Sequence, residues 1–163
     1  MRVGRETVMR RLAVIFALIL TLLAVGVSRT SSASAATNLG NAALDWAESH
    51  TLGLPYSYGA SGPEAYDCSG LVMAAYSHIG IDLPHSTYVM LSDPSAYHLH
   101  WIPLDEVYQD HLRGVLLFFG SGHVEMSTIW PGVSFGAHDS GSTIGWIHWW
   151  PGSWQPTEAF EVY

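Results

Sequence analysis

Residues 55–72 read PYSYGASGPEAYDCSGLV, and this stretch decides the fold of the chain. Residues 53–66 are rich in Gly, Pro, Ser and Tyr, which predicts an ordered loop. From Cys68 to Ile79 the apolar residues recur at helical spacing, and Gly80 suits the position just beyond a helix end. The sequence therefore predicts a loop that leads into a helix, with the single Cys of the chain at or next to the helix N-terminus.

The remainder of the N-terminal half also favours helices. A helix is expected over residues 38–50, whose apolar residues share one face at intervals of three and four. A short helix is expected near Ser86–Leu91, with Ser86 as its N-cap.

The C-terminal half changes character. It consists of short runs rich in β-branched and aromatic residues, separated by turn residues such as Pro131-Gly132. The expected strands are Val115–Phe119, His123–Trp130, Val133–His138, Thr143–Trp150 and Ala159–Tyr163. An additional strand at Tyr97–Ile102 and a helical stretch at Asp105–Leu112 are expected between the two halves. This order predicts an α+β fold, in which N-terminal helices carrying the Cys pack on a C-terminal antiparallel β-sheet.

The first 35 residues have the three-part plan of a secretory signal peptide. Residues 1–11 hold four Arg, an apolar run extends from Leu12 to Val27, and Ala33-Ser34-Ala35 fits the small-x-small cleavage pattern. The apolar run is shorter than the roughly 20 residues that a spanning helix needs, which disfavours the alternative of an uncleaved anchor. We therefore expect a signal peptide at 1–35, a single domain at 36–163, and a secreted protein, extracellular or in the cell wall, that has left the membrane.

Charge limits the partners of residues 36–163. Five of the six Lys and Arg residues lie in the first 29 positions. Residues 36–163 therefore contain one Arg, Arg113, and 13 Asp and Glu residues, which gives a formal charge of −12. Phosphate binding needs clustered cations, which excludes a nucleic-acid partner. We expect a monomer that uses no cofactor.

Cys68 is the candidate nucleophile. One Cys cannot form an internal disulfide, so in an oxidising compartment it is either a small buried residue or a reactive thiol. Backbone N–H groups and the dipole at a helix N-terminus favour a thiolate, and the same N–H groups can stabilise an oxyanion. The polar neighbours Asp67 and Ser69 argue against burial among apolar groups and favour catalysis.

A thiol nucleophile needs a His base within hydrogen-bond reach. Of nine His, His123 opens a predicted strand directly after a Gly-Ser-Gly turn, and His138 lies near the end of the next strand. A hairpin across Pro131-Gly132 would make the two residues cross-strand neighbours. One is then expected to act as the base and the other to orient its ring.

The stretch 55–72 resembles the nucleophile motif of the NlpC-type cell-wall endopeptidases. These are papain-like cysteine peptidases that cut peptidoglycan stem peptides. Their pattern, Pro-Tyr-x-Trp/Tyr-Gly-Gly-x-Gly-Pro-x-x-Tyr/Phe-Asp-Cys-Ser-Gly-Leu-Val, is matched at nearly every position. Shorter resemblances follow at Ile81–Thr87, Leu112–Phe119, His123-Val124 and Gly136–His138, so the similarity extends from about Asn38 to the C-terminus.

The resemblance implies a papain-like fold and a thioester intermediate. The catalytic residues that it implies are Cys68 as nucleophile, His123 as general base and His138 as orienting residue. The residues that it places at the oxyanion and the substrate are Tyr56, Asp67 and Ser69. In the family the bond usually cut joins the γ-carboxyl of D-glutamate to the diamino acid at position three of the stem peptide.

Three positions depart from the family pattern. Val115 follows Gly114 where the family has Asp, His85 replaces an Arg, and Glu125 stands where Gly is common. The three catalytic candidates are unaffected, so these departures bear on the substrate.

Two other functions fit the same residues. One is an amidase or acyltransferase on the same scaffold, acting on a different amide. The other is a non-catalytic module that binds the cell wall, although the complete set of Cys and two His argues against it.

Other residues could form additional sites. His98 and His100 would share one face of a strand, but no third ligand follows at a familiar spacing, so no metal site is expected. Exposed aromatic residues could line a sugar or peptide groove, although core packing is the stronger expectation for each one alone. These candidates are Tyr58, Trp101, Trp130 and Trp154.

Overall fold

The computed structural model describes residues 38–149 and 154–163. The expected signal peptide at 1–35 and the end of the strand expected at Thr143–Trp150 lie outside these residues. Within the described residues no helix has the length and apolar character needed to cross a bilayer.

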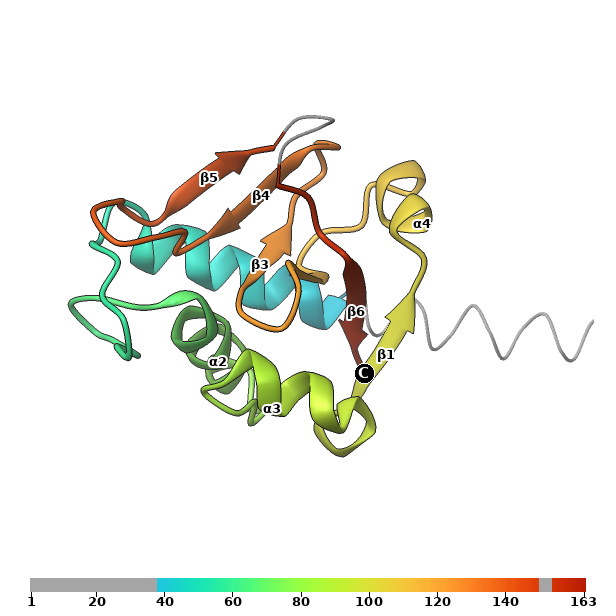
Figure 1. The fold of residues 1–163 in the computed structure, drawn as a ribbon, viewed down its shortest axis with the longest axis horizontal. Helices are drawn as coiled ribbons and strands as arrows, with labels where there is room; N and C mark the ends of the chain where they lie inside the picture. Colours follow the sequence, from blue (N-terminus) through green and yellow to red (C-terminus); the bar gives the residue numbers. More distant parts are fainter. Residues whose placement is uncertain (1–37, 150–153) are drawn as a thin grey trace, which may run out of the picture. The chain divides into compact units, whose positions relative to one another are not determined.

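Helices occupy the first part of the described chain (Figure 1). The first helix covers residues 38–51, and its apolar face is fully buried at Ala43, Leu44 and Ala47. α2 spans Cys68–His78 and α3 spans Thr87–Ser92. The side chain of Ser86 accepts a hydrogen bond from the Val89 N–H, as predicted for an N-cap. A 3₁₀ turn at Pro94–Tyr97 and the helix α4 at Leu104–Gln109 complete the helical elements of this part of the chain.

Six antiparallel strands form one sheet in the order β1-β6-β2-β3-β4-β5. They are β1 Leu99–Ile102, β2 Leu116–Phe118, β3 Val124–Ser127, β4 Val133–Gly136, β5 Gly145–His148 and β6 Glu158–Val162. Every predicted strand is present, and most are shorter than expected. β3 ends early because Thr128 Oγ1 accepts from the Trp130 N–H and donates to the Val133 carbonyl, which begins the turn to β4.

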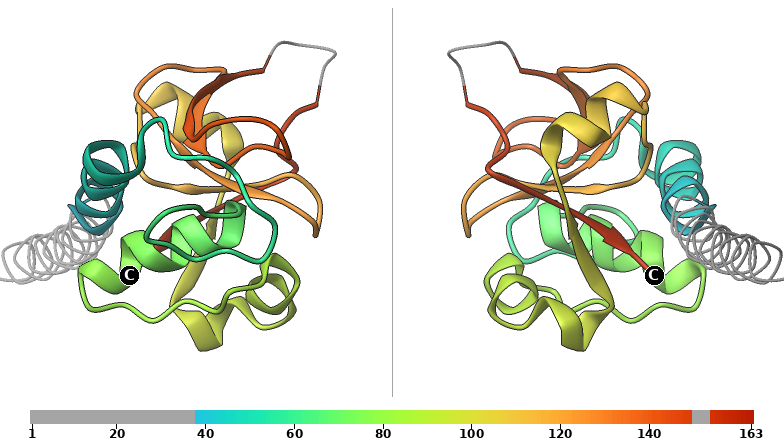
Figure 2. Two further views of the ribbon diagram at one scale, coloured as in Figure 1. Left: turned by 90° about the vertical axis from the view of Figure 1, so that its left-hand side faces the viewer. Right: turned by 90° about the vertical axis from the view of Figure 1, so that its right-hand side faces the viewer.

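Side chains on both faces of the sheet are buried. On one face Leu71 and Val72 of α2 belong to the same buried cluster as Val124 and Phe135 of the sheet. On the other face Val107 of α4 belongs to a second buried cluster, with further sheet residues. Figure 2 shows α2 and α4 on opposite sides of the strands. The predicted α+β fold is confirmed.

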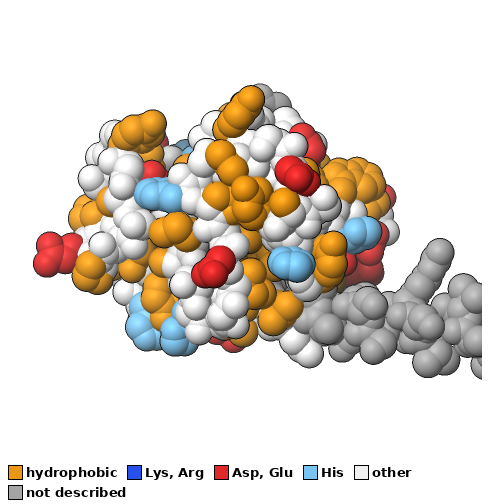
Figure 3. Space-filling view, turned by 90° about the horizontal axis from the view of Figure 1, so that it is seen from below, with side chains coloured by type: hydrophobic (Ala, Val, Ile, Leu, Met, Phe, Trp, Pro, Cys, Tyr) orange, Lys and Arg blue, Asp and Glu red, His pale blue; other side chains and the backbone are white. Residues whose placement is uncertain are grey.

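The surface of the described residues is poor in cations. Figure 3 shows one face, on which acidic and His side chains are scattered among apolar ones and no described Lys or Arg is visible. Arg113 lies elsewhere and pairs with Asp45 and Glu48, at 2.8 and 3.1 Å.

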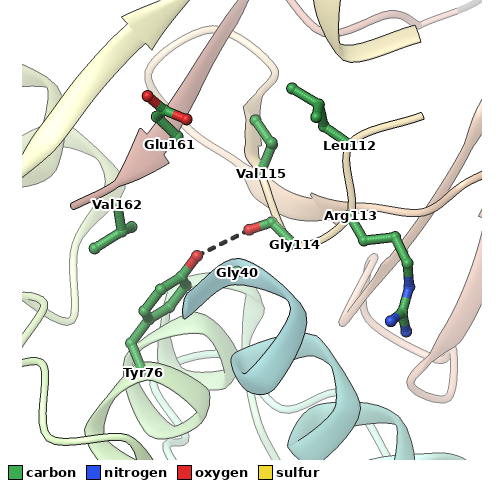
Figure 4. Close-up of a pocket in the computed structure, with 8 residues that line it drawn as sticks. All are labelled: Gly40, Tyr76, Leu112, Arg113, Gly114, Val115, Glu161 and Val162. Atoms are coloured by element: carbon green, nitrogen blue, oxygen red, sulfur yellow. Dashed lines mark hydrogen bonds between the residues drawn. The ribbon is translucent and has the colours of Figure 1, made fainter. Parts of the chain in front are cut away.

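Two glycines let the first helix approach the chain just before β2 (Figure 4). A Cβ atom on Gly114 would lie only 1.9 Å from the carbonyl oxygen of Gly40, and Gly114 has a φ of +75°. The hydroxyl of Tyr76 in α2 donates to the Gly114 carbonyl at 2.8 Å. The first helix, α2 and the start of β2 therefore meet at this point.

Gly114→Ala is expected to lower the free energy of unfolding by about 3 kcal/mol or more, because the added methyl group meets backbone and the residue must keep a left-handed φ. Gly120→Ala is the matched control, since Gly120 has a φ of +62° with nothing within 4 Å of an added Cβ. The control is expected to lose only the left-handed strain of about 1–2 kcal/mol. Urea unfolding measures both values, and equal losses would show that the contact with Gly40 is unimportant.

Candidate active site

Cys68 is the first residue of α2, and Asp67 is the N-cap of that helix. One carboxylate oxygen of Asp67, Oδ1, accepts from the Gly70 N–H at 2.7 Å, and the other, Oδ2, accepts from the Gly59 N–H at 2.8 Å. The carboxylate thus joins the preceding loop to the start of the helix. This local structure fixes the thiol at the helix N-terminus, as the sequence predicts.

Further contacts fill the surroundings of Asp67. Its Oδ1 atom lies 2.8 Å from Nε2 of His85 and 3.2 Å from Oγ of Ser69. Burial raises the pKa of Asp67, but hydrogen bonds from Gly70, His85 and Gly59 bring the pKa below its usual range. Asp67 is thus a structural anion at the helix start, and a part for it or Ser69 in holding substrate stays a prediction.

Cys68 itself is buried, with 8% of its surface exposed. The expectation that polar neighbours oppose its burial is wrong, because Asp67 and Ser69 are buried too, at 6% and 7% exposure. Their polar atoms are satisfied by hydrogen bonds within the chain. Tyr56 lies close enough to Cys68 and Asp67 for their charges to act on its phenol. Burial first, and then these two charges, raise the pKa of Tyr56.

The two candidate histidines lie opposite each other across the β3–β4 hairpin. Met126 pairs with Phe135 and Ser127 with Ser134, a register that continues to His123 and His138. Their ring centroids lie 5.6 Å apart. The predicted cross-strand relation is confirmed.

Glu125 stands between the two rings. Its Oε1 atom lies 2.9 Å from His123 Nε2 and 2.9 Å from His138 Nδ1. Its Oε2 atom accepts a hydrogen bond from the Ser134 hydroxyl, and the residue is fully buried. Because Nε2 of His123 faces Glu125, Nδ1 is the ring nitrogen that is left to interact with Cys68, which raises the pKa of His123.

The hydrogen bonds among Glu125, His123 and His138 stabilise the charged form of each residue. Burial would raise the pKa of Glu125, but hydrogen bonds from His123, His138 and Ser134 lower it to about 2. Burial would lower the pKa of His123, but hydrogen bonds to Cys68 and Glu125, together with their charges, raise it to about 9. The hydrogen bond with Glu125 also raises the pKa of His138. At neutral pH the site thus contains the Glu125 carboxylate and a His123 imidazolium, which is the partner that a thiolate needs.

Glu125 is a functional residue that the sequence patterns do not single out, since it stands out there only as a departure from a family Gly. A signal was present: His123, Glu125 and Ser127 alternate with the apolar Val124 and Met126, so they share the opposite face of the strand. The cross-strand neighbour Gly136 has no side chain and so makes space for Glu125, because a Cβ at position 136 would lie 2.7 Å from Cγ of Glu125.

Trp154 covers the histidines. Its ring centroid lies 4.9 Å from that of His123 and 5.1 Å from that of His138, and it stacks on Phe119 at 3.9 Å. Of the four aromatic residues considered for a groove, this is the one that reaches the candidate catalytic residues.

One cluster in the described part of the chain has metal-ligand atoms close together, namely His123, Glu125 and His138, within 4.8 Å. Their hydrogen bonds to one another account for this arrangement. The rings of His98 and His100 instead contact Tyr163, at 5.8 and 6.3 Å between centroids.

A sequence profile of the NlpC/P60 family matches residues 53–145, which include Cys68, His123 and His138. The chain belongs to the NlpC/P60 family. The resemblance inferred from residues 55–72 is confirmed by this match.

Curated relatives of this NlpC/P60 chain are longer proteins. A "probable endopeptidase" of Corynebacterium glutamicum is 39% identical over 69 residues, which are 41% of this chain and 32% of the relative. A "probable endopeptidase" of Mycobacterium tuberculosis is 49% identical over 39 residues, which are 24% of this chain and 10% of the relative. The matched segments thus span about a third and a tenth of these two proteins.

Solved NlpC/P60 structures share the fold. The P60 domain of an antigen from M. avium subspecies paratuberculosis aligns with a TM-score of 0.58 at 22% identity, over 78% of this chain and 95% of that one. The peptidoglycan hydrolase RipB of M. tuberculosis aligns with a TM-score of 0.59 at 22% identity, over 80% and 66%. At this identity the likeness shows the fold alone.

Proposed function

We propose that this protein is a cysteine endopeptidase that hydrolyses an amide bond of the peptidoglycan stem peptide. The observation that carries the proposal is the position of His123, which is hydrogen-bonded to the buried carboxylate of Glu125 and lies close enough to Cys68, at the start of α2, for Cys68 to raise its pKa. Membership of the NlpC/P60 family and the presence of a peptidoglycan hydrolase among the solved structures of this fold support the choice of substrate.

The first half of the reaction acylates Cys68. The thiolate attacks the amide carbonyl carbon, and the carbonyl electron pair moves to oxygen. Backbone N–H groups at the start of α2, with the Tyr56 hydroxyl, stabilise the resulting oxyanion. The His123 imidazolium gives its proton to the leaving amine, the C–N bond breaks, and the acyl group remains on Cys68 as a thioester.

The second half releases the acid. Neutral His123 takes a proton from water as the water oxygen attacks the thioester carbonyl. The C–S bond breaks, Cys68 leaves as a thiolate, and His123 is again an imidazolium. In both halves of the reaction Glu125 orients the His123 ring through a hydrogen bond with Nε2 and stabilises the positive charge of the imidazolium. His138 and Ser134 in turn form hydrogen bonds with Glu125.

Two finer proposals rest on the sequence. The bond cut is the one between the γ-carboxyl of D-glutamate and the diamino acid, which follows from the resemblance of residues 55–72 to the family motif. Residues 1–35 direct export and are removed after Ala35, which follows from their basic, apolar and small-residue plan.

Digestion of purified sacculi, followed by mass analysis of the released fragments, tests the proposal. The expected products are fragments that have gained one water and carry a free γ-carboxyl on D-glutamate. Cleavage between muramic acid and the first alanine would indicate an amidase, and transfer to an amine without gain of water would indicate an acyltransferase. Sedimentation of the protein with sacculi, without released fragments, would indicate a binding module.

A further inference from the structure

A groove lies at the end of the β3–β4 hairpin away from His123. It is lined by Glu48, Arg113, Thr128, Ile129, Trp130 and Trp146 and has a volume of about 360 Å³, within the range of small-ligand sites. We call it the tryptophan groove. Strands rise about 3.3 Å per residue, so Thr128, just after β3, lies roughly 16 Å from His123, just before it. The groove is therefore separate from the candidate catalytic residues.

Its two indole rings are exposed. Trp130 is 65% exposed and Trp146 is 51% exposed, with Ile129 beside them at 42%. Exposed large apolar side chains that cluster in a groove mark a binding surface more often than scattered ones do. A flat ligand face that packs on these rings would bury apolar area with little polar area left unpaired.

The ring of Trp146 and the turn that carries Trp130 are held in place. The Trp146 Nε1–H donates to Oε1 of Glu48 at 3.2 Å, and the same ring contacts Phe135 edge-on at 5.7 Å. The Trp130 N–H is bonded to Thr128 Oγ1 at 3.2 Å, which fixes the turn. A preformed surface loses little conformational entropy on binding.

The polar part of the groove disfavours an anionic ligand. Nη2 of Arg113 donates to Asp45 at 2.8 Å and to Glu48 at 3.1 Å, so two carboxylates accompany the one guanidinium. No other Lys or Arg occurs in residues 36–163. A wholly apolar partner is disfavoured as well, because it would remove water from these charges without offering hydrogen bonds.

A neutral sugar meets both requirements. A pyranose ring has apolar C–H faces that pack on indole, and its hydroxyl and N-acetyl groups can hydrogen-bond to the carboxylates and the guanidinium. We propose that the tryptophan groove binds neutral N-acetylated hexosamines, as found in the glycan strand of peptidoglycan. This inference rests on the proposed function only for the identity of the polymer, and it adds a second contact through which the wall is held near Cys68.

A titration with the tetramer of N-acetylglucosamine, in which NMR monitors the indole N–H signals, tests the groove directly. Trp130→Ala and Trp146→Ala are each expected to weaken binding about tenfold, the effect of losing roughly 1.4 kcal/mol. Trp101→Ala is the matched control, since Trp101 is 54% exposed but belongs to β1 at the other edge of the sheet. It is expected to bind like the unchanged protein.

Several results would contradict a sugar site in the tryptophan groove. Absence of binding at millimolar tetramer, or equal affinity in all three variants, would overturn the proposal. A change of oligomeric state in Trp130→Ala or Trp146→Ala without sugar binding by the unchanged protein would identify a protein interface and overturn it too. Because the titration needs no turnover, sugar binding by a protein that cuts no stem peptide would refute the proposed function and leave the groove supported.

Discussion

Cys68→Ala and Cys68→Ser are both expected to abolish the release of fragments from sacculi while the protein stays folded. Ala has no nucleophile. Ser keeps the volume of the side chain, but its hydroxyl is not ionised by a neighbouring imidazolium. For both variants turnover is expected to fall by about 10⁴-fold or more, the usual scale for loss of a nucleophile.

His123→Ala is expected to have an effect of the same size, because the thiolate loses its partner and the leaving amine loses its proton donor. His78→Ala is the matched control, since His78 is an exposed residue at the end of α2. Liquid chromatography with mass detection of released peptides measures turnover, and thermal unfolding checks the fold. Full activity in Cys68→Ala would remove Cys68 from the mechanism.

Glu125→Gln is expected to lower kcat/KM by about 100-fold with little change in the fold, because Gln keeps the shape of a buried side chain but removes its charge. The Glu125 carboxylate helps to hold the pKa of His123 at about 9. Without that charge, burial pulls the pKa of His123 down. The alkaline limit of activity is therefore expected to move to lower pH.

Two further variants complete this test. His138→Ala is expected to cost less than Glu125→Gln, about tenfold, because His138 acts on His123 through Glu125, which Ser134 also holds. Glu158→Gln, at an exposed carboxylate of β6, is the charge control. Profiles of kcat/KM against pH measure all three. A larger loss in His138→Ala than in Glu125→Gln would assign the orienting role to His138 directly.

Much of the fold was predictable from local patterns. Asp67, Ser86 and the glycine and proline turns act over a few residues, so helix starts and strand breaks could be placed from sequence. The side-chain bonds of Thr128 that end β3 early depend on which residues meet across the turn. The sequence therefore predicts the positions of the strands more accurately than their ends.

The candidate site shows the same division. The hairpin across Pro131-Gly132 fixes the pairing of His123 with His138, so their proximity could be derived from spacing alone. The place of Glu125 depends on room made by Gly136 and on the Ser134 hydroxyl, and both come from the neighbouring strand. The burial of Cys68 likewise depends on how Asp67 is satisfied by Gly59 and His85.

The most direct test of the account is the intact mass of the protein quenched in acid during turnover of a purified stem peptide. If Cys68 is the nucleophile, part of the protein gains the mass of the acyl fragment, and peptide mapping locates that mass on Cys68. Steady turnover by a protein whose Cys68 has been fully alkylated beforehand would contradict the account.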